Sequence, residues 1–169
     1  MRWLVAVLLM LTAGVCGAES WHVVKPHGLG LVIEFPLKPN LSEQTVDLGK
    51  IGKATMRIHQ VRTSNTIYDL TVVDYPKGAL TESPETQLDN ARDGALRNAM
   101  GPLIAETKIT VAGQPARELL IDMTMGYLVR SRIFFVGDRL FNVGAITKKG
   151  NETSADIEKY FASFKLTPK

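Results

Sequence analysis

Three arginines in the C-terminal half have the types and spacing that could bind an anion. Arg130 and Arg132 are two residues apart in an apolar segment, so a strand would point both side chains to the same face. Arg117 lies in the preceding apolar segment, on the face that also carries Leu119 and Ile121. Guanidinium groups bind carboxylates and phosphates through paired, charge-assisted hydrogen bonds. Arg117, Arg130 and Arg132 are therefore candidates for a rim that binds a small anion or a carboxylate.

The same arginines could instead be neutralised inside a sheet. If the two segments form the simplest hairpin, Arg130 lies opposite Asp122, and Arg132 lies diagonal to Glu118 or Asp122. Cross-strand ion pairs of this kind are common and contribute little to stability when exposed. The pattern favours internal ion pairs over an anion-binding rim, and both interpretations stay open.

The histidines are not spaced for a metal site or for catalysis. His22 and His27 are five residues apart in an irregular segment, which does not define a zinc site. His59 alternates with Arg57 and Val61 along a strand, without a carboxylate or nucleophile beside it in the sequence. We therefore expect no metal and no catalytic histidine.

The acidic residues and glycines give no catalytic motif either. Asp89 and Asp93 are four residues apart on a helix and are expected on its solvated face, which does not resemble a pair of glycosidase carboxylates. The glycines at 28 and 30 precede a strand, so they cannot present helix N–H groups to a phosphate. A nucleophile elbow and a metalloprotease helix are also absent from the sequence. We expect a protein that is not an enzyme and binds no cofactor.

The first 18 residues have the composition of a cleavable signal peptide. Arg2 provides the positive start, residues 3–11 are continuously apolar, and Cys16, Gly17 and Ala18 provide the small residues of a cleavage site. The apolar run is too short to span a bilayer, which takes about 20 residues. We expect cleavage after Ala18 and export to the periplasm or the cell exterior, with no membrane span left after cleavage.

Cys16 could also belong to a lipoprotein signal. That signal has a large aliphatic residue three positions before the cysteine and a small residue directly before it. Here Ala13 and Val15 occupy these positions in the reverse order, so a lipid anchor is not expected. Cys16 is the only cysteine, and the mature chain therefore has no disulfide and no thiol nucleophile.

Length and charge further limit the classes of protein to which this chain could belong. Residues 19–169 are the right length for a single domain and are numerous enough to form a core without disulfides. The chain has 20 Lys and Arg against 17 Asp and Glu, a net charge of +3 without any basic cluster. So small an excess does not indicate binding to nucleic acid or to a membrane surface.

Alternation and turn residues predict a chain of strands with two helices. Ser83 is a good N-cap with Pro84 at the first helical position, and Gly101-Pro102 should end this helix. A second helix is expected over 154–164. Turns are expected at 64–65, 113–115, 124–126 and 137–138. The expected strands are 29–35, 45–48, 53–63, 66–75, 104–111, 116–123, 128–136 and 139–147.

The last hairpin is apolar on both faces. Ile133 and Phe135 point to one face, while Phe134, Phe141 and Val143 point to the other. An antiparallel sheet with one solvated face would alternate cleanly between apolar and polar residues. We therefore expect an α+β fold, an α/β/α sandwich in which two helices cover the two faces of an antiparallel sheet.

The order of these elements resembles the PsbP-like superfamily, which includes the extrinsic oxygen-evolving subunit of photosystem II, the DcrB lipoproteins and short exported bacterial proteins of unknown function. The match covers nearly all of the mature chain, although Ala116 stands where a glycine is common. The resemblance implies an antiparallel sheet between helices and an accessory or binding role without catalysis. The matching segments are Glu34-Phe35-Pro36 with Pro39, 88–93, 113–118, 139–141 and 161–166.

We therefore expect an exported, non-catalytic module of the cell envelope that contacts a protein partner. This expectation depends on a likeness of fold, and fold does not determine function. The alternative is a protein that binds a small ligand or an anion through the arginines described above.

Overall fold

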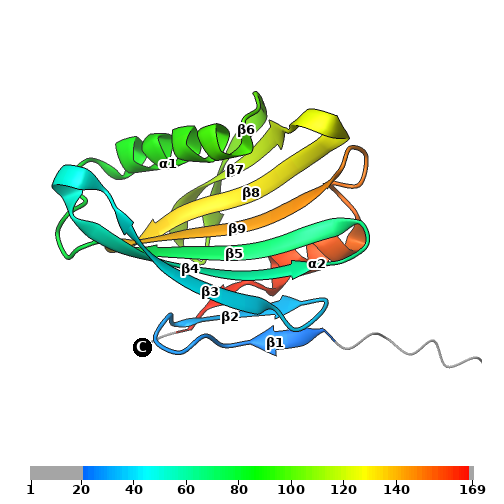
Figure 1. The fold of residues 1–169 in the computed structure, drawn as a ribbon, viewed down its shortest axis with the longest axis horizontal. Helices are drawn as coiled ribbons and strands as arrows, with labels where there is room; N and C mark the ends of the chain where they lie inside the picture. Colours follow the sequence, from blue (N-terminus) through cyan, green and yellow to red (C-terminus); the bar gives the residue numbers. More distant parts are fainter. Residues whose placement is uncertain (1–20, 168–169) are drawn as a thin grey trace, which may run out of the picture.

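A seven-stranded antiparallel sheet forms the centre of the computed structural model, which describes residues 21–167 (Figure 1). Its strand order is β3-β4-β5-β9-β8-β7-β6. Residues 1–18, the predicted signal peptide that contains Cys16, lie outside the described residues. The strands are β3 (Asn40–Asp47), β4 (Lys53–Arg62), β5 (Thr66–Asp74), β6 (Leu103–Val111), β7 (Gln114–Asp122), β8 (Tyr127–Val136) and β9 (Arg139–Lys148).

A second, three-stranded sheet brings the two ends of the described chain together. β2 (Leu31–Phe35) lies between β1 (His22–Val24) and β10 (Lys165–Leu166) and is antiparallel to both. The sequence analysis did not predict β1 or β10, because strands of three and two residues are too short to show periodicity.

Two helices lie on opposite faces of the large sheet. α1 (Pro84–Ala99) packs on β7 and β8, while α2 (Ala155–Ser163) packs on β2 and, with the small sheet, covers the other face (Figure 1). The predicted N-cap of α1 is confirmed, since the Ser83 side chain accepts a hydrogen bond from the Thr86 backbone N–H at 3.2 Å. Two short 3-10 turns, η1 (Gly49–Ile51) and η2 (Thr124–Gly126), complete the chain. The predicted α+β sandwich around a central antiparallel sheet is confirmed.

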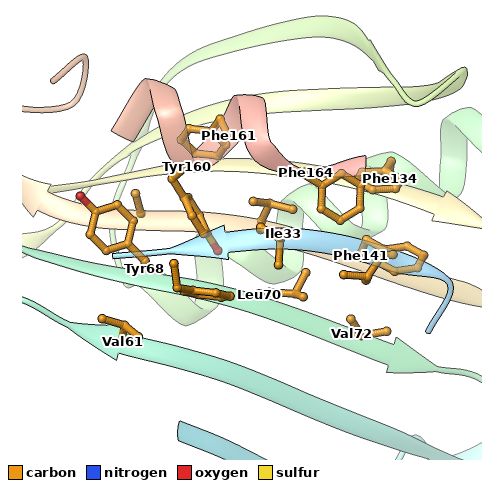
Figure 2. Packing of buried hydrophobic residues seen from close by; sticks show 14 of the residues in the cluster. Ile33, Val61, Tyr68, Leu70, Val72, Phe134, Phe141, Tyr160, Phe161 and Phe164 are labelled. Atoms are coloured by element: carbon orange, nitrogen blue, oxygen red, sulfur yellow. The ribbon is translucent and has the colours of Figure 1, made fainter. Parts of the chain in front are cut away.

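Each face of the large sheet has its own hydrophobic cluster. The larger cluster lies between the sheet, α2 and β2, and its aromatic rings interlock (Figure 2). The Tyr160 ring lies 5.1 Å from Tyr68 and 5.2 Å from Phe35. The smaller cluster lies under α1 and contains Leu88, Leu119, Ile121 and Ile133. The predicted division between Ile133 on one face and Phe134 on the other is therefore confirmed.

Two local predictions were wrong. The turn before β7 consists of Ala112 and Gly113, both with positive φ, and Gln114 and Pro115 already belong to the strand. The second wrong prediction is the pairing of Arg130 with Asp122. The turn predicted at 124–126 is present as η2, and the Met123 N–H donates to the Tyr127 carbonyl across it at 2.9 Å. This turn fixes the pairing of β7 with β8, and it places Arg130 opposite Leu120 instead of Asp122.

Candidate functional site

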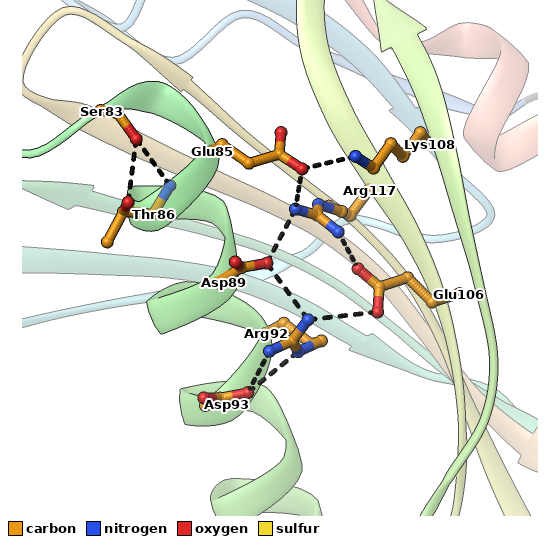
Figure 3. A network of polar contacts seen from close by, with 9 residues as sticks. All are labelled: Ser83, Glu85, Thr86, Asp89, Arg92, Asp93, Glu106, Lys108 and Arg117. Carbon is orange, nitrogen blue, oxygen red and sulfur yellow. Dashed lines mark hydrogen bonds and ion pairs between the residues drawn. The ribbon is translucent and has the colours of Figure 1, made fainter.

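Arg117 lies on the α1 face of the sheet, inside a network of carboxylates (Figure 3). Its side chain is only 6% exposed. It donates to Glu85 and Asp89 of α1, at 2.8 Å in each case, and to Glu106 of β6. Arg92 extends the network through a 3.1 Å bond to Asp89. Asp89 and Asp93 are therefore partly engaged in ion pairs, where the sequence analysis expected a solvated helix face.

Arg130 and Arg132 lie on the opposite face, against α2. Arg132 donates to Glu118 at 2.6 Å, and Arg130 donates to the same carboxylate at 3.2 Å and also to Glu158. The two guanidinium groups lie 5.0 and 4.7 Å from the centre of the Phe161 ring. The hydrogen bond to Glu158 raises the pKa of Arg130, although burial, the largest influence, acts in the other direction.

The three arginines do not form one rim. The sheet separates Arg117 from Arg130 and Arg132, because neighbouring residues of paired strands alternate between its two faces. Each guanidinium also has at least one carboxylate partner. The geometry therefore agrees with internal neutralisation, which the sequence pattern favoured over an anion-binding rim.

A groove lies on the α1 face, on the part of the sheet that the helix does not cover. α1 packs on β7 and β8, and the side chains that β4, β5 and β9 present beside it, such as Gln60, Thr71 and Asn142, are half-buried or exposed. We call this cavity the sheet-face groove, and its volume is about 240 Å³. It is lined by Ile58, Gln60, Asp69, Thr71, Ala95, Asn98, Ala99, Ile121, Met123, Val129, Ser131, Asn142, Gly144 and Ile146.

Asp69 is the only ionisable residue in the lining of the sheet-face groove. Its carboxylate accepts a 3.3 Å hydrogen bond from the Thr71 hydroxyl and forms no ion pair with any residue of 21–167. It lies over Gly144, where an added Cβ would come within 2.6 Å of the Asp69 Oδ1 atom. Burial raises the pKa of Asp69 to about 6, and the bond from Thr71 only partly opposes this shift. Perturbed carboxylates in clefts are typical of functional sites.

Amide and hydroxyl groups surround this carboxylate. Gln60 is directly opposite Asp69 in the pairing of β4 with β5, and Gly144 is directly opposite it on β9. The Ser131 hydroxyl donates a 2.5 Å hydrogen bond to the Asn142 side-chain oxygen. An amide is not a base, so this pair cannot generate a serine nucleophile.

A second cavity continues the sheet-face groove toward the ends of β4 and β5. Its volume is about 320 Å³, and it shares Met123 and Ile146 with the groove. Ile67 and Tyr127 add further half-exposed apolar surface there, and Tyr127 is 36% exposed. The two cavities adjoin. The sheet-face groove carries the Asp69 carboxylate, and the second cavity combines this apolar surface with Arg62 and the polar residues 63–66.

A larger cavity on the molecule offers less chemistry than the sheet-face groove. It has a volume of about 680 Å³ and lies near the start of β9. Its Arg139 side chain bonds to Asp74 and donates to the backbone carbonyls of Gly28 and Leu29, at 3.2 Å each. Asp74 is also paired with Arg57. Arg139 and Asp74 hold the loop before β2 against the large sheet, and both are already engaged in ion pairs.

The histidines occupy separate places. His22 lies on β1, His27 lies in the following turn, and His59 is buried on the α2 face. Burial lowers the pKa of His59, and the nearby Arg57 lowers it further. Residues 21–167 contain no group of three or more metal-ligating side chains. Within the same range, no helix is long and apolar enough to cross a membrane.

Asp69 was not among the residues predicted from the sequence, although the pattern of β5 contains a signal for it. In β5, Asp69 and Thr71 alternate with the apolar Tyr68, Leu70 and Val72, so the pattern places the polar pair on one face. The pattern does not show that this face is partly uncovered beside α1. That information comes from the placement of the helix.

A likeness to known proteins is found at the level of structure. No family model and no curated protein matches the sequence. The solution structure of cyanobacterial PsbP from Synechocystis sp. PCC 6803 matches with a TM-score of 0.58 and 11% identity, over 93% of this chain and 98% of that chain. This chain has a PsbP-like fold. The resemblance inferred from the sequence is confirmed for the fold, and identity this low shows the fold alone.

A second structure is more distant from the PsbP-like fold of this chain. PA94 from Pseudomonas aeruginosa, described as a protein of unknown function and a putative regulator, matches with a TM-score of 0.38 and 12% identity. The match covers 78% of this chain and 85% of that chain, and it is too weak to support an argument. Neither structure is described as an enzyme.

Proposed function

We propose that this protein is an exported, non-catalytic binding module that contacts a protein partner in the cell envelope. The sheet-face groove is its docking site. The observation that carries this proposal is the half-covered α1 face, where a groove with apolar and polar walls holds a carboxylate without an ion-pair partner in residues 21–167. On the other face, α2 and the small sheet cover the core.

The chemistry of the groove indicates the kind of partner. Apolar side chains next to amides and hydroxyls are typical of protein interfaces, which combine an apolar centre with a polar rim. Asp69 adds one negative charge, so a complementary partner segment carries positive charge at this point. We therefore propose a basic segment of a partner protein as the occupant.

Anion binding by the three arginines is less well supported. Arg117, Arg130 and Arg132 are all hydrogen-bonded to carboxylates of the same chain. An external anion would have to displace these carboxylates, and the displaced groups would be left without partners.

A matched pair of arginine substitutions tests the proposal in cells. Gln60→Arg places a guanidinium opposite Asp69 and should fill the groove, whereas Gln44→Arg makes the same change on β3, away from the groove. Both positions are exposed, so neither change removes core packing. We expect crosslinking and mass spectrometry to find one dominant envelope partner with the parent protein and with Gln44→Arg, and to lose it with Gln60→Arg.

Two outcomes would contradict the docking site. A partner that both variants retain would bind elsewhere on the molecule. Absence of any partner above background with the parent protein would argue against a protein-binding module altogether. Melting temperatures of the purified variants control for loss of the folded state.

A further inference from the structure

We propose that Asp69 forms a subsite for a single cationic side chain, an arginine or lysine of the partner protein, which enters the sheet-face groove. This inference rests on the proposed function and names the group that the groove recognises. It is carried by the position of one unpaired carboxylate in a cavity that has room for a ligand group.

The first argument is the isolation of the Asp69 charge. Many of the other buried or half-buried arginines and carboxylates in residues 21–167 are joined in pairs and networks, as at Arg117 and at Glu118. Asp69 has only the 3.3 Å bond from Thr71. A half-buried carboxylate without a cation is unfavourable, and a cation supplied from outside would compensate for it.

The second argument is the room beside this carboxylate. The groove volume of about 240 Å³ is roughly eight times the share of one water molecule in the liquid. Gly144 provides part of this room, because any larger residue would collide with the Asp69 side chain. The space is therefore sufficient for a guanidinium or ammonium group together with part of its stem.

The third argument is the distribution of polar and apolar groups. Gln60, Thr71 and Asn142 line the same groove, and their side-chain oxygen atoms can accept hydrogen bonds from the N–H groups of a cation. Ile58 and Ile146 form apolar walls suited to the methylene groups of an arginine or lysine stem. An anionic ligand would meet no positive charge in this lining.

Short peptides test the subsite without the partner. The purified protein, expressed with its own N-terminal segment, is titrated with acetyl-Ala-Arg-Ala-amide and with the same peptide carrying citrulline, the neutral isostere of arginine. Two-dimensional ¹H–¹⁵N NMR reports which backbone amides shift. We expect saturable shifts around Asp69 and Gly144 for the arginine peptide, and at least about tenfold weaker binding for the citrulline peptide.

A charge-neutral variant provides the second arm. Asp69→Asn keeps the shape of the side chain and removes its charge, so it should abolish the preference for arginine over citrulline. The matched control is Asp47→Asn on the exposed end of β3, which should keep the full preference. Equal binding of both peptides, an unchanged preference in Asp69→Asn, or no saturable shifts up to about 10 mM would overturn the proposal.

The pH dependence gives an independent outcome. The groups that face Asp69 from β4, β5, β8, β9 and α1 are Gln60, Thr71, Ser131, Asn142 and Asn98, none of which is ionisable. Burial raises the pKa of Asp69 to about 6, so the carboxylate is charged above this pH and neutral below it. Arginine binding should therefore be lost as the pH falls through this range, and binding that is unchanged at pH 5 would contradict the proposal.

The two proposals can fail separately. Loss of the cellular partner in Gln60→Arg without any arginine preference in the peptides would retain the docking site and reject the cationic subsite. Arginine preference in the peptides together with full partner capture by Gln60→Arg would retain the subsite and reject the groove as the docking site.

Discussion

Arg117 is the single residue whose loss should cost the most electrostatic stability. Arg117→Ala leaves Glu106, Asp89 and Glu85 facing one another around a buried gap. Because breaking a buried ion pair leaves uncompensated charge, we expect the free energy of unfolding to fall by about 2–4 kcal/mol, measured by urea denaturation. Lys108→Ala removes an exposed cation from the same network and should change the denaturation midpoint little. Equal effects of the two substitutions would show that burial of Arg117 is unimportant.

The observed positions of the three candidate arginines show what the sequence can predict for single residues. The sequence places Arg130 and Arg132 on one face, and the bond of Arg132 to Glu118 agrees with one of the expected cross-strand contacts. The expected pairing of Arg130 with Asp122 was wrong, because Arg130 lies opposite Leu120 and bonds to Glu118. It does not reveal that Arg117 is bound by α1, because Glu85 and Asp89 are far from it along the chain. Asp69 was missed for the same reason, since its exposure depends on where the helix lies.

At the scale of elements, replacing glycine by alanine should have opposite effects on stability at Gly94, inside α1, and at Gly101, just after it. In Gly94→Ala the new Cβ lies 3.8 Å from its nearest neighbour, so the change should stabilise the helix by about 0.5–1 kcal/mol. In Gly101→Ala the new Cβ would lie 1.6 Å from the Asp122 backbone oxygen, and the expected loss is about 2 kcal/mol or more. Thermal unfolding measures whether each substitution raises or lowers the melting temperature. A Gly101→Ala protein as stable as the parent would refute the close approach of Gly101 to the Asp122 backbone.

The end of α1 combines a local feature at Met100 with a tertiary contact after it. Met100 adopts a left-handed conformation with φ of 52°, and the Asp122 N–H then donates to the Pro102 carbonyl at 2.9 Å. The sequence predicted the helix boundaries from Ser83 and Gly101-Pro102, because capping is a local property. The docking of the helix end on β7 is a tertiary contact that local patterns do not contain.

At the scale of the whole molecule, the last strand closes the fold against the first. β10 pairs with β2, Leu166 packs against the larger cluster, and the Thr167 N–H donates to Gly30 at 2.8 Å. Deletion of residues 165–169 should lower the free energy of unfolding by about 2 kcal/mol, because it removes these bonds and the burial of Leu166. The matched control is Lys165→Ala, which removes an exposed side chain but keeps the backbone pairing of β10 and the burial of Leu166, so its melting temperature should match that of the parent protein. Equal melting temperatures for the deletion and for Lys165→Ala would mean that β10 contributes nothing.

The sequence by itself determined the parts of this protein that depend on near neighbours. Alternation identified the seven strands of the large sheet, although β3 starts five residues earlier than expected, and capping residues located α1. The apolar character of both faces of the last hairpin predicted that the sheet is covered on both sides. These features follow from side-chain periodicity and from backbone hydrogen bonding within a few residues.

Only the tertiary structure decided how those elements combine into sites. It separated Arg117 from Arg130 and Arg132, joined the ends of the chain in a small sheet, and left Asp69 in a groove beside α1. The physical reason is that each outcome depends on which distant segments share a face and how far a helix extends across a sheet. Side-chain patterns fix the face of each residue, whereas packing between distant segments decides what covers it.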